Sequence, residues 1–255
     1  MTGNLAAVGL LVTGSLVAGA VAAAWLRLSA RVAALLTAFG GGLLLAAVAL
    51  ELLPEADRSA GRLWTALGLV GGAALYVGAD AWLTRDQHVA AMRRSGHAAA
   101  AGQPMSMPAH SAEAARGETI AAGIVVDGIP ESLALGLMAA AGEPGAALLV
   151  AVVLGNVTEA YGAAQPIVAG GHPRRFATGL LSGIGVGLGA TAVLGGTLGA
   201  DTSAAVVGTA QAVAAGAVLA VLSISIIPYT FEEVSSRVAL ATTLGVTAGY
   251  LLSQP

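Results

Sequence analysis

Two short stretches near the middle of the sequence place acidic and amide side chains inside otherwise apolar segments. Asp127 and Glu131 are four residues apart, and Asn156 and Glu159 are three apart. On a helix, side chains at these spacings share one face. Carboxylate and amide oxygens gathered in one place suit a divalent cation. If the two faces are turned toward each other, these four residues make an oxygen-rich cluster, with the Thr158 hydroxyl as an accessory group.

The segments around these residues have the composition of a membrane protein. Hydrophobic residues make up 56% of the 255-residue chain and charged residues only 10%, whereas soluble domains carry about 25% charged residues. A bilayer core about 30 Å thick needs roughly 20 apolar residues per helix. Marking where charges interrupt the apolar runs predicts eight spans, over residues 4–26, 32–53, 63–83, 119–141, 145–169, 176–199, 203–231 and 238–253. The predicted fold class is an all-α polytopic membrane protein, with residues 1–255 forming one transmembrane domain.

Ionisable groups at membrane depth are costly, by about 2.5–3.5 kcal/mol on insertion scales, and usually mark an ion site or pathway. The chain has no Lys, and no Arg lies within the two spans that carry the candidate ligands. A divalent cation would offset the cost of the acids, and so would protons that leave them neutral. A structural alternative is a pair of protonated acids hydrogen-bonded between helices. Glu51, which ends the second span, is an accessory or pathway candidate that could equally reach the lipid headgroups.

The distribution of Arg predicts the orientation of the spans, because cytoplasmic loops accumulate positive charge. One side carries only Arg58 and Arg62. The other side carries Arg27, Arg31, Arg85, Arg93, Arg94, Arg116, Arg174, Arg175 and Arg237. Both termini are therefore predicted to lie outside the cytoplasm, in a multi-pass protein of the cytoplasmic (inner) membrane. Residues 84–118 form a predicted flexible cytoplasmic loop, whose His88, His97 and His110 could collect metal ions weakly although their spacing matches no preformed site.

An internal similarity links the second and seventh spans. Gly42 precedes Pro54 by 12 residues, and Gly216 precedes Pro228 by the same 12. Spans 1–3 and 6–8 then form two repeats around spans 4 and 5, in a 3+2+3 arrangement. Because each repeat has an odd number of spans and two spans separate them, the repeats must be inverted in the membrane. Carriers often bind their cargo near the midplane between such halves.

Three motifs resemble those of the ZIP family of zinc and iron permeases. Asp127-Gly-Ile-Pro-Glu-Ser132 is similar to the family's fourth-span His-Asn-x-Pro-Glu-Gly, and Gly155-Asn-Val-Thr-Glu-Ala160 to its fifth-span motif. Glu51-Leu-Leu-Pro-Glu-Ala56 is similar to His-Leu-Leu-Pro-Glu-Ala at the end of its second span. The resemblance extends over nearly the whole chain, through the eight spans and the long inner loop.

This resemblance implies that Glu131, Asn156 and Glu159 ligate metal, with Asp127 in place of the expected His. It also makes Ser132 and Ser225 candidate accessory positions, and it implies a homodimer as a candidate assembly. Ser225 stands where the family's seventh span often has an acid, and residues 186–187 stand where its sixth span often has Glu-Pro. A second metal position is thus predicted to be missing. Without imidazole, the oxygen ligands shift the preference from Zn²⁺ toward Mn²⁺ or Fe²⁺.

The hypothesis from the sequence is a carrier that takes up Zn²⁺, Mn²⁺ or Fe²⁺ by alternating access at a midplane site. The metal ion is the transported substrate, and we expect no prosthetic group and no enzymatic activity. A proton-coupled carrier of another solute stays open, as does a transport-inactive, ZIP-like metal sensor or structural membrane protein. A net charge of −3 without a basic patch excludes nucleic acid as a partner, which leaves the lipid bilayer and the metal ion.

Overall fold

The structure, a computed structural model, describes residues 2–26, 28–83, 109–140 and 145–253. Within these ranges, the side chains of residues 2–4, 30, 80, 82–83, 109–120, 122, 126 and 127 lie outside the described set. Every regular element in the described part is helical. The elements are α1 (Thr2–Trp25), α2 (Ala30–Ala47), η1 (Val48–Leu52), α3 (Leu53–Ala60), α4 (Arg62–Leu83), α6 (Ala109–Ala140), α7 (Ala146–Ala169), α8 (Arg174–Ala200), α9 (Ala204–Val221), η2 (Leu222–Ile226), α10 (Ile227–Val234) and α11 (Arg237–Leu252). Apolar runs rich in Ala and Leu favour helices, which satisfy their own backbone hydrogen bonds in lipid.

Within the described residues, seven helical stretches are long and apolar enough to cross a membrane. The eighth predicted span corresponds to α11, which is apolar but has only 16 residues. The predicted all-helical, multi-pass character is therefore confirmed. One boundary differs, because α6 begins at Ala109 and the last part of the predicted loop over residues 84–118 is helical. Charges set the predicted boundary there, but the Ala-rich run that carries them has high helix propensity.

Large apolar side chains cover the outside of the bundle. Leu10 of α1, Val70 of α4 and Leu240 of α11 are 72%, 70% and 71% exposed. In water, so large an apolar surface would mark an interaction site or a tendency to aggregate. Lipid tails are as apolar as these side chains, so the surface suits a bilayer.

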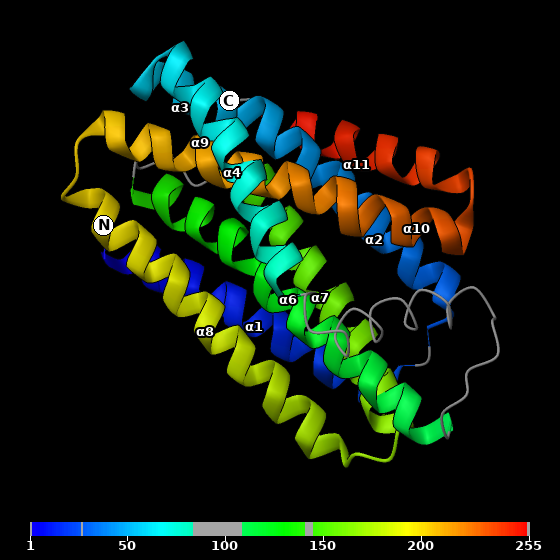
Figure 1. The fold of residues 1–255 in the computed structure, drawn as a ribbon. Helices are drawn as coiled ribbons and strands as arrows, with labels where there is room; N and C mark the ends of the chain where they lie inside the picture. Colours follow the sequence, from blue (N-terminus) through cyan, green and yellow to red (C-terminus); the bar gives the residue numbers. More distant parts are fainter. Residues whose placement is uncertain (1, 27, 84–108, 141–144, 254–255) are drawn as a thin grey trace.

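The helices pack in two groups. One group contains α1, α6, α7 and α8, and the other contains α2, α3, α4, α9, α10 and α11. In Figure 1 the first group lies toward the lower left and the second toward the upper right. The groups meet mainly where α7 packs on α2 and where α6 packs on α9. Helix α1 begins, and α11 ends, toward the same end of the bundle (Figure 1), as an even number of crossings requires.

Two composite helices have the same construction. Each contains an α-helix of 18 residues, a π-helical turn of five residues and an α-helix of eight residues. The first is α2, η1 and α3, and the second is α9, η2 and α10. Ser29 precedes the first and Ser203 the second. Each composite helix ends at a residue with positive φ, which is 79° at Gly61 and 53° at Ser235.

A proline follows the π-helical turn at the same position in both composite helices. These residues are Pro54 and Pro228. Proline lacks an N–H, and its ring crowds the carbonyl group four residues earlier. That carbonyl belongs to Leu50 in η1 and to Ile224 in η2. Each proline therefore loosens the helix inside the π-helical turn.

Both composite helices also approach a neighbour through a glycine. Gly42 of α2 lies against the carbonyl oxygen of Thr242 in α11, and Gly216 of α9 lies against that of Leu69 in α4. A Cβ atom at either position would overlap a backbone oxygen. The two helix pairs can pack this closely only because the residue is glycine.

Candidate metal centre between two central helices

Helices α6 and α7 pack against each other and place polar side chains in the interior of the bundle. Glu131 lies near the middle of the apolar part of α6 and is 6% exposed. Asn156 lies near the middle of α7 and is 2% exposed. Glu159, one turn further along α7, is half-buried. Two carboxylates and one amide thus lie away from the helix ends on two packed helices.

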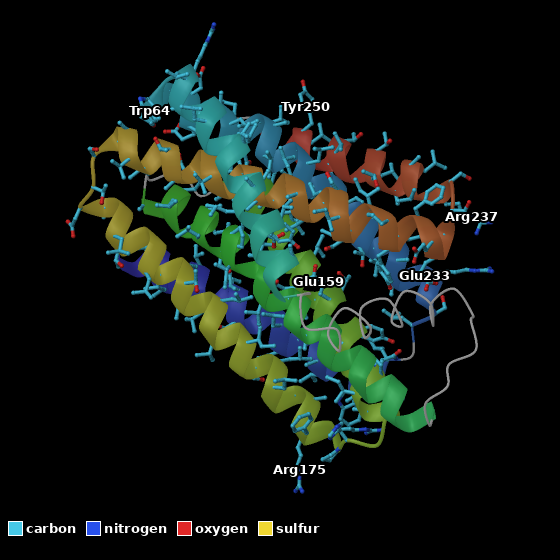
Figure 2. The ribbon with its side chains drawn as sticks, in the orientation of Figure 1. Trp64, Glu159, Arg175, Glu233, Arg237 and Tyr250 are labelled. Carbon is cyan, nitrogen blue, oxygen red and sulfur yellow. The ribbon has the colours of Figure 1, made fainter. Side chains whose placement is uncertain are left out.

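Figure 2 shows how these positions relate to the ends of the bundle. Glu159 lies between the two ends, with Trp64 at one end and Arg175, Glu233 and Arg237 at the other. Charged side chains are expected at the ends, where water and lipid headgroups solvate them. No Arg lies within residues 123–140 of α6 or within α7. These two segments therefore contain no cationic side chain that could neutralise the interior acids.

The residues next to Glu131 indicate that this part of α6 packs against other helices and does not face lipid. Helix α6 continues through Pro130, which cannot donate a backbone hydrogen bond. Ser132 is 1% exposed, and its Oγ has no hydrogen-bond partner in the part of the chain that the structure describes. A buried hydroxyl of this kind is costly unless a partner satisfies it. Ser132, which follows Glu131 in the chain, thus stays a candidate accessory group.

Asn156 is held by a hydrogen bond from α7 to α1. Its Nδ2 donates to Ser15 Oγ over 3.0 Å, and Ser15 Oγ donates to the carbonyl oxygen of Val12 over 2.7 Å. Ser15 is itself 5% exposed. Sequence reasoning missed Ser15, because a single Ser in an apolar span gives no sign of its partner. The one hint in the sequence is that Ser15 carries a hydroxyl group, whereas its neighbours on the same face of the helix are apolar.

The other accessory positions in the two central helices and in η2 have different surroundings. The Thr158 hydroxyl donates to backbone carbonyl oxygens of its own helix, Leu154 at 3.1 Å and Gly155 at 2.9 Å. Ser225 is half-buried in η2, which packs on α2, α9 and α10. The hydrogen bonds of Thr158 and the helix contacts of η2 do not link Thr158 or Ser225 to Glu131 or Asn156.

Glu51 caps the start of α7. Its Oε1 accepts from the backbone N–H of Ala147 and its Oε2 from that of Leu148, both over 3.1 Å. The Ser253 hydroxyl donates to Oε1 over 3.0 Å. The first N–H groups of a helix lack intrahelical partners and attract negative charge. The carboxylate of Glu51 thus has a structural role in this conformation.

Several predicted site residues lie outside the description. The side chains of Asp127 and His110 are not described, although both residues are in α6, and His88 and His97 fall in the undescribed residues 84–108. Among the residues that are described, no three His, Asp or Glu side chains gather closely enough to hold a metal ion. Glu131, Glu159 and the Asn156 amide are the described part of the predicted set, and the fourth predicted ligand, Asp127, has a side chain outside the described residues.

A cavity of about 80 Å³ lies elsewhere, among α2, η2, α10 and α11. Its lining is mostly apolar, and two of its three hydroxyl side chains bond to their own composite helix. Ser223 donates to Leu219 and Thr230 to Ile226, each over 2.8 Å to the backbone oxygen. Without a carboxylate, this cavity does not suit a divalent cation.

A second buried amide also escaped sequence reasoning. Gln211 in α9 is 1% exposed, and neither end of its amide has a hydrogen-bond partner within the described ranges. It lies in the second helix group, away from α7.

In comparisons with known proteins, no protein-family model matches the chain, and no curated protein matches it.

Proposed function

We propose that this protein is a carrier that moves a divalent transition-metal ion into the cell across the cytoplasmic membrane. The observation that carries the proposal is the burial of Glu131 and Asn156 within the apolar parts of two packed helices. A buried carboxylate is costly unless a cation or a proton offsets its charge. The resemblance of the surrounding motifs to those of ZIP permeases favours a metal ion as that cation.

The cargo site consists of Glu131, Glu159 and Asn156, completed by Asp127. All four ligands offer oxygen atoms, which favours Mn²⁺ or Fe²⁺ while still allowing Zn²⁺. Ligation requires ionised carboxylates, so metal affinity falls in acid as they protonate. Ser132, with a buried hydroxyl beside Glu131, is an accessory group that a hydrated cation could satisfy.

The two matched composite helices support an inverted repeat. Their elements agree in length and order, and each carries its proline at the same place after the π-helical turn. The packing follows the same symmetry. The second span (α2) packs on the eighth (α11), and the seventh span (α9) packs on the third (α4). Spans 1–3 and 6–8 are the repeats, and α6 and α7 lie between them. Such halves place a cargo site at the midplane.

Transport proceeds by movement of one helix group against the other. The α1, α6, α7 and α8 group carries the cargo ligands, and the composite helices belong to the second group. The π-helical turns η1 and η2 are the points where the second group bends most easily. Arg175 and Arg237 lie at one end of the bundle (Figure 2), and the bias of Arg toward that side makes it cytoplasmic.

A transport-inactive metal sensor is the second candidate. It is favoured by the ligand positions that the chain lacks relative to the ZIP pattern, since Ser225 and residues 186–187 stand where the family often has an acid and Glu-Pro. A sensor requires binding without flux, whereas a carrier requires both. A proton-coupled carrier of another solute would work in the presence of a chelator.

Uptake into proteoliposomes distinguishes these functions. Zn²⁺, Mn²⁺, Fe²⁺ and Cd²⁺ are compared side by side, with the Glu131→Ala, Glu159→Ala double variant as the control. The proposal expects saturable uptake by the wild type and none above empty liposomes by the double variant. Binding without uptake in folded protein would select the sensor. An absence of both binding and uptake for every metal would refute the proposal.

A further inference from the structure

The hydrogen bonds around Asn156 determine which end of its amide faces α1. Ser15 has one hydroxyl proton, and the 2.7 Å contact gives it to the carbonyl oxygen of Val12. Ser15 Oγ can then only accept from Asn156, over the 3.0 Å contact. An amide nitrogen donates and an amide oxygen accepts. The nitrogen of the Asn156 amide is therefore fixed on the side of α1.

This orientation has a consequence for a cation. With Nδ2 bound to Ser15, the oxygen Oδ1 is the end of the amide that is left to contact a metal ion. The two ends of an amide have nearly the same shape, so without a partner the group can turn over. The turned group would present N–H hydrogen atoms, which carry positive partial charge and repel a cation.

The backbone of α1 is held close to α7 beside this hydrogen bond. Gly19, one turn after Ser15 in α1, lies against the carbonyl oxygen of Val157, and a Cβ atom at Gly19 would overlap it. Val157 follows Asn156 in the chain. The short approach at Gly19 keeps Ser15 within reach of the amide, so the orientation of Asn156 is set by α1 as well as by its own helix.

We propose that Ser15 is the positioning residue that aims Asn156 Oδ1 at the transported metal ion. This inference rests on the proposed function, since it assigns Ser15 a role at the same cargo site. Groups that orient a metal ligand from behind typically contribute 10–100-fold to metal affinity. Ser15 touches Asn156 and not the metal ion.

The hydrogen bond itself can be tested without metal. The sequence contains two asparagines, Asn4 and Asn156, so ¹⁵N labelling of Asn side chains gives two NH₂ groups by NMR, and Asn156→Asp assigns them. We expect slow solvent exchange for the Asn156 NH₂ group, and a change in its chemical shift in Ser15→Ala. Ser223→Ala, which also removes a hydroxyl bonded to its own helix, is the matched control and should leave it unchanged. An Asn156 signal that Ser15→Ala does not move would overturn the inference.

Mn²⁺ binding to the full chain in lipid nanodiscs tests the positioning role. Ser15→Ala should weaken binding by about tenfold, and Ser15→Thr, which keeps the hydroxyl, should restore it. The same Ser15→Ala change should matter about twofold or less in an Asn156→Asp background, because both oxygens of a carboxylate are alike and its orientation is unimportant.

The outcomes separate the two claims. Equal losses in both backgrounds would mean that Ser15 acts only through the packing of α1 on α7, and would refute positioning. Unchanged affinity in Ser15→Ala, with normal binding by the wild type, would refute positioning and leave the carrier intact. A wild type that binds neither Mn²⁺ nor Zn²⁺ would overturn the proposed function and the role of Ser15 together.

Discussion

The carboxylate of Glu51 accepts a hydrogen bond from the backbone N–H of Leu148, so an acid of the second span caps the helix of the fifth. The other carboxylate oxygen accepts from Ala147. Gly145 makes this contact possible, since a Cβ atom there would overlap the Glu51 carboxylate. The cap joins the two helix groups at the end of the helix that carries Asn156 and Glu159.

Replacing Glu51 should therefore destabilise the fold. Loss of an N-terminal cap costs roughly 0.5–2 kcal/mol in the free energy of unfolding. Glu51→Ala should lie in this range. Glu51→Gln should cost less, because its single carbonyl oxygen keeps one of the two bonds from α7. Unfolding in detergent, followed by circular dichroism, measures both changes.

Glu55→Ala is the matched control for the cap. Glu55 pairs with Arg58 over 3.1 Å, but the Arg58 side chain is 67% exposed. Exposed ion pairs contribute about 0–1 kcal/mol. If Glu51→Ala and Glu55→Ala unfold at the same midpoint, the cap makes no special contribution to stability.

The glycines of the two composite helices should respond alike to substitution. Gly42→Ala and Gly216→Ala each force a Cβ atom onto a backbone oxygen, and overpacking of this kind costs about 1–3 kcal/mol. Gly14→Ala is the control, because a Cβ atom at Gly14 meets nothing within 4 Å. In that open position Ala should be neutral or stabilising by up to about 1 kcal/mol. If only one of the Gly42→Ala and Gly216→Ala variants has a lower unfolding midpoint than the wild type, the two glycines do not have equivalent roles.

Thr158 should matter much less to metal uptake than Asn156. Its hydroxyl donates to the backbone of its own helix, an arrangement typical of Thr within helices that serves local geometry. We expect Thr158→Val, which keeps the shape, to change the KM for Mn²⁺ uptake by about twofold or less, given that local role. Asn156→Ala should raise the KM by at least about tenfold. A comparable rise in Thr158→Val would make the hydroxyl a ligand.

Apolar runs and Pro positions were enough to predict the helices and the likeness of two of them. Pro54 and Pro228 stand at equal distances from a glycine, and the structure builds both composite helices around them. The π-helical turns could not be predicted, because η1 and η2 have the same apolar composition as the helix on either side. They follow from crowding at a single carbonyl group, which leaves no periodic pattern in the sequence.

Burial of Glu131 and Asn156 was predictable from their position in apolar runs, but their partners were not. Ser15 is far from Asn156 in the chain, and Glu51 is far from Leu148. Each pair forms only when packed helices bring distant residues together. Glu51 was a pathway candidate by its type and place, and only the start of α7 reveals its role as a cap.

The place where the metal ion binds can be located by anomalous diffraction from crystals soaked in Zn²⁺. We expect a peak between α6 and α7, with oxygen atoms of Glu131 and Glu159 about 2.0–2.2 Å from the metal ion. The peak should disappear in the Glu131→Ala, Glu159→Ala variant. If the strongest peak lies away from these two helices, or persists in the double variant, the metal ion does not bind at Glu131 and Glu159.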